Sequence, residues 1–144
     1  MTSHPRKVLI VDDDMSDTYL LNRMLRKCGV SDVESVETTY EASKYMVGLR
    51  PFEFRHLPNL IFVDLSMSGM SGLQFISSIK GNPLYRNIIM VALSGSSDPS
   101  DKTKAMKSGA NAYYEKALGT DTLQCTVKDA LGLAATTENM VLQH

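Results

Sequence analysis

Three consecutive aspartates, Asp12, Asp13 and Asp14, come directly after the aliphatic run VLIV at residues 8–11. Like charges at the end of a buried segment repel one another and lose hydration, so this arrangement needs a compensating cation. Mg²⁺ takes oxygen ligands, usually one or two carboxylates together with waters and phosphate oxygens. The aspartate run therefore predicts a Mg²⁺ site that would also attract a phosphoryl group.

Three further polar residues, Asp64, Ser94 and Lys116, each follow a short apolar segment of strand length. Asp64 is the lone acid at the end of its segment. It is therefore the candidate nucleophile for an aspartyl-phosphate, which leaves Asp12 and Asp13 for the metal. A lysine ammonium and a hydroxyl group would hold the remaining phosphoryl oxygens through charge-assisted hydrogen bonds.

Strand and helix patterns alternate along the chain around these residues. Short aliphatic runs indicate buried strands, and apolar residues that recur every three or four positions indicate helices. The expected strands are 7–11, 32–37, 60–63, 88–93 and 112–114, and the expected helices are 16–27, 40–47, 71–79, 98–107 and 120–131. Five such units predict an α/β fold: a doubly wound, five-stranded parallel sheet with helices on both faces. Ligands bind at the carboxyl ends of such strands, so the polar strand ends predict one pocket.

The composition fits one globular domain. The chain has 144 residues, 43% of them hydrophobic, and a formal net charge of −1, so we expect no general attraction to nucleic acid or to an anionic membrane. No stretch approaches the roughly 20 apolar residues that a membrane span needs. Cys28 and Cys125 share no metal-ligand spacing and are expected to be free thiols in a reducing compartment. These features predict a cytoplasmic protein.

The sequence resembles the receiver domain of two-component response regulators. The resemblance rests on the segments VLIVDDD, FVDLSMSGMSG, VALSGSS and SGANAYYEKA and on their order along the chain. It implies a flavodoxin-like fold with strand order 2-1-3-4-5. The implied division of the chain is an N-terminal tail at 1–5, the receiver domain at 6–131 and a C-terminal tail at 132–144.

The resemblance implies a role for each acid of the pocket. Asp64 would be the phosphoacceptor, and Asp13 and Asp64 would bind Mg²⁺ directly together with the backbone carbonyl of Ser66. Asp12 would reach the metal through water. Asp14 is instead expected to cap the helix that follows it. The resemblance implies no further cofactor.

The resemblance also implies a switch. Lys116 and Ser94 would hold the phosphoryl group, Ser94 would move inward, and the ring of Tyr113 would turn in behind it. Tyr113 and Tyr114 are adjacent on a strand and should point to opposite faces, so one of the two rings is expected in the core. The face formed by the last two helices and the fifth strand would then change for a partner.

The implied partners are proteins. A histidine kinase or a phosphotransfer protein would donate the phosphoryl group, and a downstream protein target would read the switched face, which also offers a route to a homodimer. The segment after residue 131 is too short for an output domain, so we expect a stand-alone regulator whose only chemistry is its own phosphorylation and dephosphorylation. The loop 49–59 and the stretch KGNPLYRN resemble stand-alone receivers that partner phytochrome-type kinases.

Two positions depart from the family pattern. Ser68 stands four residues after the phosphoacceptor, where proline is usual, and Ala117 stands where the family has a proline joined by a cis peptide. A cis bond before alanine costs about 3 kcal/mol more than a trans bond. The Lys116–Ala117 bond is therefore either trans with a shifted loop, or cis and held by the pocket. These departures keep open a receiver that only docks and is never phosphorylated.

Two other classes of protein share parts of this pattern. A flavodoxin-type flavin binder needs a Gly/Ser/Thr-rich loop after the first strand, where this chain has Asp12–Asp14, which would repel a flavin phosphate. A haloacid dehalogenase-type phosphatase needs a second aspartate two residues after its nucleophile, where this chain has Ser66. The chain meets neither requirement, so both comparisons favour the receiver.

Overall fold

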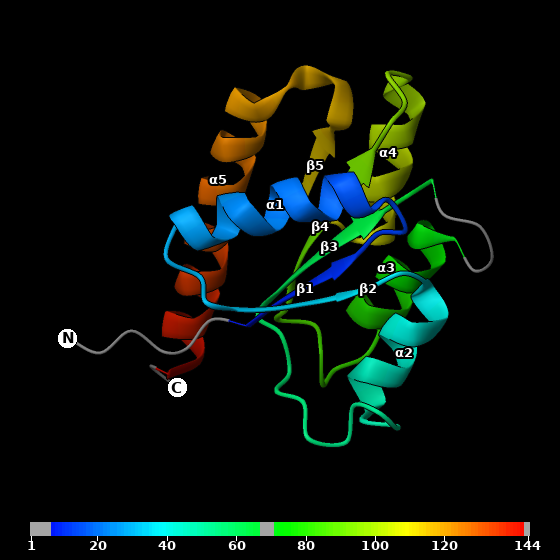
Figure 1. Cartoon of the computed structure of the whole chain (residues 1–144). Helices are drawn as coiled ribbons and strands as arrows, with labels where there is room; N and C mark the ends of the chain where they lie inside the picture. The colour runs from blue at the N-terminus through cyan, green and yellow to red at the C-terminus, as the bar shows by residue number, and fades with distance from the viewer. Residues whose placement is uncertain (1–6, 67–70, 143–144) are drawn as a thin grey trace.

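Five parallel strands form one sheet in the order β2-β1-β3-β4-β5 (Figure 1). The computed structural model describes residues 7–66 and 71–142. The strands are β1 (Lys7–Val11), β2 (Asp32–Val36), β3 (Leu60–Asp64), β4 (Ile89–Ser94) and β5 (Ala112–Glu115). This strand order confirms the predicted doubly wound, flavodoxin-like fold, and each strand lies within two residues of its expected bounds at either end.

Helices cover both faces of the sheet, as predicted. They are α1 (Met15–Lys27), α2 (Thr39–Val47), α3 (Gly72–Lys80), α4 (Pro99–Ser108) and α5 (Thr120–Leu142), and a 3₁₀ turn, η1 (Lys116–Leu118), joins β5 to α5. Helices α1 and α5 lie on one face, and α2, α3 and α4 lie on the other (Figure 1). Within the described ranges, no helix is long and apolar enough to cross a membrane.

The expected end of the last helix at Leu131 is wrong. Helix α5 continues through Gly132 to Leu142. The reason lies in its buried face, because Ala134 is packed into the same core as Val127 and Leu131 and so extends the apolar stripe by another turn. The division of the chain into a domain and tails stays a prediction, and the tail 1–5 lies outside the described residues.

The sheet separates two hydrophobic cores. Val8 and Ile10 of β1 face the core under α1 and α5, while Leu9 and Val11 face the core under α2, α3 and α4. Strands buried on both faces need apolar residues at every position, which explains the continuous aliphatic runs in the sequence. Cys28 and Cys125 are free thiols, as expected.

The loop between α2 and β3 is tied to the end of α2. The guanidinium of Arg55 donates hydrogen bonds to the backbone carbonyls of Tyr45 and Met46, at 2.9 and 3.0 Å, so it satisfies two carbonyls in the last turn of the helix. Among the described residues, Arg50–Pro51 is the only cis peptide. The Lys116–Ala117 bond is therefore trans, the first of the two options above, and the chain turns there through η1.

Replacing Gly72 with alanine should destabilise the protein by about 1–3 kcal/mol, because overpacking forces backbone or side chains to move. A Cβ at Gly72 would lie 2.8 Å from the backbone carbonyl oxygen of Asp64 and 3.1 Å from side-chain atoms of Leu65 and Val63. Gly132 is the matched control: a Cβ added there would meet nothing within 4 Å, so Gly132→Ala should stabilise α5 by about 0.5–1 kcal/mol. Urea unfolding would measure both changes, and equal midpoints for the two variants would contradict the prediction.

Candidate functional site

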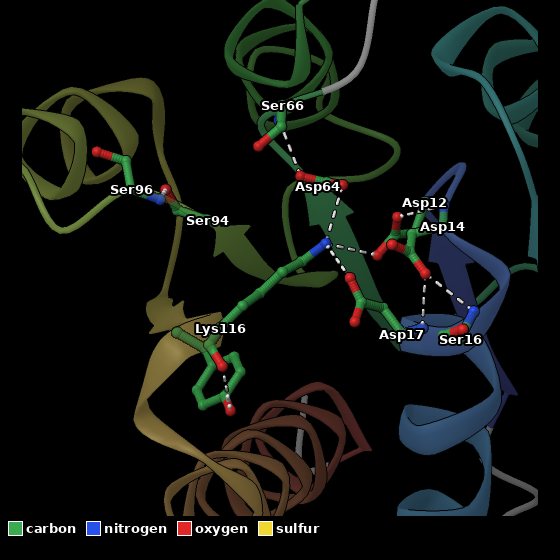
Figure 2. Close-up of polar contacts among 10 residues, drawn as sticks. Asp12, Asp14, Ser16, Asp17, Asp64, Ser66, Ser94, Ser96 and Lys116 are labelled. Carbon is green, nitrogen blue, oxygen red and sulfur yellow. Dashed lines mark hydrogen bonds and ion pairs between the residues drawn. The ribbon is translucent and has the colours of Figure 1, made fainter.

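Four polar residues meet at the carboxyl edge of the sheet because of the strand register. Val11 pairs with Val63, and Asp64 pairs with Leu93, so the ends of β1, β3 and β4 lie level. Ser94 pairs with Glu115, the residue before Lys116. The structure thus brings the predicted residues Asp12, Asp64, Ser94 and Lys116 to one edge of the sheet (Figure 2).

Three carboxylates of this edge are suited to a metal ion. Asp12, Asp13 and Asp64 each offer an oxygen, and these oxygens lie within 4.8 Å of one another. The side chains of Asp12 and Asp64 are 1% and 3% exposed, whereas Asp13 faces solvent. An all-oxygen set with one side open to water fits a hard divalent cation that keeps some of its own waters.

Local turns orient the two buried carboxylates in the same way. The Oδ1 atom of Asp12 accepts a hydrogen bond from the backbone N–H of Asp14 at 2.9 Å, and the Oδ1 atom of Asp64 accepts one from the N–H of Ser66 at 2.8 Å. The other oxygen of each acid, Oδ2, then faces Lys116. The Lys116 Nζ atom lies 3.1 Å from Oδ2 of Asp12 and 3.0 Å from Oδ2 of Asp64. The backbone therefore sets which oxygen of each acid faces the lysine.

Lys116 has a third carboxylate partner, which the sequence analysis missed. Its ammonium lies 2.7 Å from Oδ2 of Asp17, in the first turn of α1, as Figure 2 shows. A lysine ammonium has three N–H donors, and here three acids can take them: Asp12 directly after β1, Asp17 in α1 and Asp64 at the end of β3. The available signal was the spacing, since Asp17 lies one helical turn after Asp14, the predicted cap that the structure confirms as the N-cap of α1.

The two buried acids differ in their proton affinity. Burial, followed by the nearby Asp64 carboxylate, raises the pKa of Asp12 to about 6. Burial also acts to raise the pKa of Asp64, but hydrogen bonds from the Ser66 N–H and from Lys116 outweigh it and lower that pKa. Burial acts to lower the pKa of Lys116, yet its three carboxylate partners raise it above the ordinary value. At neutral pH Asp64 is therefore ionised and Lys116 charged.

Binding of a divalent cation should weaken by up to about tenfold for each pH unit below about 6, since a proton on Asp12 removes one of the negative charges that attract the cation. The sign follows from the raised pKa: above it Asp12 is already ionised, and the affinity should level off. Isothermal titration calorimetry from pH 5 to 8, in two buffers of different ionisation enthalpy, would give both affinity and proton release. Asp12→Asn should flatten the profile, and an affinity independent of pH in the parent protein would contradict the prediction.

Ser94 and Tyr113 meet at a third residue, Ser96. The buried Oγ of Ser94 accepts a hydrogen bond from the backbone N–H of Ser96 at 3.0 Å, and Figure 2 shows this pair apart from the group around Lys116. The hydroxyl of Tyr113 donates to the Ser96 carbonyl at 3.5 Å. Tyr114 is buried among α1 and α5 while Tyr113 packs against the opposite core, which confirms their opposite directions.

Ser66 and Ser68 follow Asp64 in the sequence and were both singled out by the sequence analysis. Ser66 lies beside the acids and its N–H binds Asp64, while a metal contact through its carbonyl stays a prediction. Ser68, the first departure from the family pattern, lies outside the described residues. The trans bond before Ala117 leaves Lys116 within reach of both Asp12 and Asp64.

Comparison with known proteins gives a consistent result. A family model described as the response regulator receiver domain matches residues 8–128. The chain is 30% identical over 126 residues to the two-component response regulator ARR9 of Arabidopsis thaliana, covering 76% of this chain and 52% of ARR9. It is 32% identical over 146 residues to the transcriptional regulatory protein ZraR of Klebsiella oxytoca, covering 99% and 30%. The chain thus spans about half or less of the length of these relatives.

Solved structures of similar size also match. The phosphorylated cyanobacterial phytochrome response regulator RcpA has a TM-score of 0.77 at 26% identity, with 88% of this chain and 91% of that chain covered. A response regulator structure from Chloroflexus aurantiacus has the same TM-score and identity, with 90% and 99% covered. These matches favour neither the flavin binder nor the dehalogenase-type phosphatase.

Proposed function

The chain belongs to the response regulator receiver family, and from that premise we propose that it accepts a phosphoryl group on Asp64 from a histidine kinase or a phosphotransfer protein. The observation that carries the proposal is the position of the Asp64 carboxylate. It is buried, it lies 3.0 Å from the ammonium of Lys116, and it shares the candidate metal site with Asp12 and Asp13. The proposed nucleophile, the proposed cation for the phosphoryl oxygens and the candidate metal ligands thus lie together.

The proposed cofactor is Mg²⁺, which Asp13, Asp64 and the backbone carbonyl of Ser66 would hold directly and Asp12 through water. When bound, it would neutralise the acids and the incoming phosphoryl oxygens. Asp64 enters the reaction ionised, since its pKa is lowered. One of its carboxylate oxygens forms the bond to phosphorus while the bond from phosphorus to the donor histidine nitrogen breaks. Lys116 and Ser94 then hold phosphoryl oxygens.

The proposed response passes through Ser96. If Ser94 turns towards the phosphoryl group, its Oγ leaves the N–H of Ser96, whose carbonyl is the partner of Tyr113. The Tyr113 ring would then turn in, and the face formed by α4, β5 and α5 would change for a downstream protein or for a second copy of the chain. We propose no enzymatic activity beyond phosphorylation and dephosphorylation of the chain itself, which would take place in the cytoplasm.

The relatives support a kinase as the donor. One of them is the sensor histidine kinase CheAY of Helicobacter pylori, of which this chain matches 15% at 25% identity. RcpA is named as a phytochrome response regulator and was crystallised in its phosphorylated form. A phytochrome-type histidine kinase is therefore the donor to test first, and a stand-alone regulator is the proposed form of the protein.

The test is phosphorylation by acetyl phosphate, read by intact mass. With Mg²⁺ the protein should gain one phosphoryl adduct that hydroxylamine removes, as it removes an acyl phosphate. Excess chelator should prevent the adduct. Binding of Mg²⁺ by calorimetry with no adduct from acetyl phosphate or from a phosphorylated kinase would favour the receiver that only docks.

A further inference from the structure

Asp17 differs from the other two carboxylate partners of Lys116. Asp12 and Asp64 belong to the acid group suited to a metal, so a bound cation would share these two carboxylates with the lysine. Asp17 is not part of that group, and its contact of 2.7 Å is the shortest of the three. A cation in the site would therefore compete with the lysine for two of its three carboxylate partners and leave the third, Asp17.

We propose that Asp17 is a positioning residue for Lys116: it holds the ammonium at the site while Asp12 and Asp64 are engaged with metal and phosphoryl group. This inference rests on the proposed function. It claims that α1, through the carboxylate of Asp17, orients the side chain of Lys116, which follows β5 at the edge of the sheet.

The backbone of Asp17 is well anchored for this role. The Asp14 carboxylate caps α1 by accepting hydrogen bonds from the N–H groups of Ser16 and Asp17, at 2.9 and 3.1 Å. The N–H of Asp14 in turn donates to Asp12 at 2.9 Å. Asp17 is thus joined to the metal-binding acids through a short chain of hydrogen bonds, which Figure 2 shows.

The segment that carries Lys116 has weaker support of its own. None of the residues of η1 is buried, and Leu118 is exposed. The hydroxyl of Tyr114 ties down the end of this turn by donating to the carbonyl of Gly119 at 2.8 Å. Lys116 and Asp17 line the same small cavity of about 40 Å³. The three acids are therefore the contacts that direct the ammonium of Lys116.

Asp17 is also too exposed to act mainly on stability. Its side chain is 38% exposed, and ion pairs reached by solvent contribute little to folding. We therefore expect Asp17→Asn to leave the urea midpoint nearly unchanged. If Asp17→Asn alters the position of the Lys116 ammonium but not the stability of the fold, Asp17 acts as a positioning residue and has no general structural role.

The test is a double-mutant cycle on the rate of phosphorylation by acetyl phosphate. Asp17→Asn should slow the reaction by about tenfold, because the amide oxygen can still accept but lacks the charge that strengthens the hydrogen bond to Lys116, and Asp17→Glu should restore part of the rate. In a Lys116→Met background the same change at Asp17 should have no further effect. Glu37→Gln is the matched control, since Glu37 shares a groove with Asp12 and its change removes the same charge. The control should keep the rate of the parent protein.

A second readout needs no phosphodonor. With Mg²⁺ present, the ammonium protons of Lys116 should exchange slowly enough to be seen by ¹⁵N NMR, and Asp17→Ala, which removes the acceptor altogether, should lose that signal. A signal that persists, faster phosphorylation of Asp17→Asn, or an equal effect in both lysine backgrounds would overturn the inference. If the parent protein gains no adduct, the proposed function fails, and the ammonium signal still decides whether Asp17 holds Lys116.

Discussion

Replacing Asp64 with asparagine should lower the rate of phosphoryl adduct formation by at least about a thousandfold, because loss of a nucleophile removes the reaction route itself. The amide is nearly the same shape, and its oxygen can still accept the hydrogen bond from the Ser66 N–H. Lys116 keeps Asp12 and Asp17 as partners. The fold should therefore be retained, and the lower rate should come from the missing nucleophile.

Intact mass after incubation with acetyl phosphate and Mg²⁺ measures this loss. Asp129→Asn is the matched control, because it makes the same chemical change on the exposed side of α5. The control should form the adduct at the rate of the parent protein. An equal adduct on Asp64→Asn would place the nucleophile at another residue and remove the basis of the proposed function.

Lys116→Met should change two properties in opposite directions. Phosphorylation should slow by about a hundredfold or more, as expected when one preorganised donor to a developing charge is removed. Mg²⁺ should bind about tenfold more tightly, because the ammonium now lies 3.1 and 3.0 Å from oxygens of Asp12 and Asp64 and repels a second cation. Methionine keeps much of the length of the side chain without its charge.

Calorimetry with Mg²⁺ and a time course of adduct formation would separate the two effects. Lys128→Met makes the same change on the exposed side of α5 and should alter neither property. If Mg²⁺ affinity fell together with the phosphorylation rate, Lys116 would be needed to shape the metal site. The prediction that the ammonium of Lys116 competes with Mg²⁺ would then be wrong.

The sheet could be predicted because burial acts on every residue of its central strands. In β1 and β3 each side chain enters one of the two cores, so the sequence shows unbroken aliphatic runs. The far end of α5 could not be predicted in this way. The sequence analysis ended this helix at Leu131, while the burial of Ala134 depends on its packing into the core that also holds Val127 and Leu131.

The candidate site was predictable where it depends on strand ends and not where it depends on helix packing. Parallel strands bring their carboxyl ends together whatever the helices do, so Asp12, Asp64 and Lys116 could be grouped from the sequence. The spacing of Asp17 from Asp14 places it one helical turn into α1, but its contact with Lys116 also requires the distance between α1 and the end of β5, which that spacing does not give. The trans bond before Ala117 was one of two open options, and only the backbone itself decided between them.

Ser96 touches both halves of the proposed switch, with its N–H on Ser94 and its carbonyl on Tyr113. If phosphorylation and the position of the Tyr113 ring are coupled there, the coupling must be reciprocal. Consider a target that binds only when the ring is turned in. Phosphorylation strengthens the binding of this target by some factor, and the bound target shifts the phosphorylation equilibrium with the donor by the same factor. The abundance of the target would then help to set how much of the protein is phosphorylated at a given level of kinase.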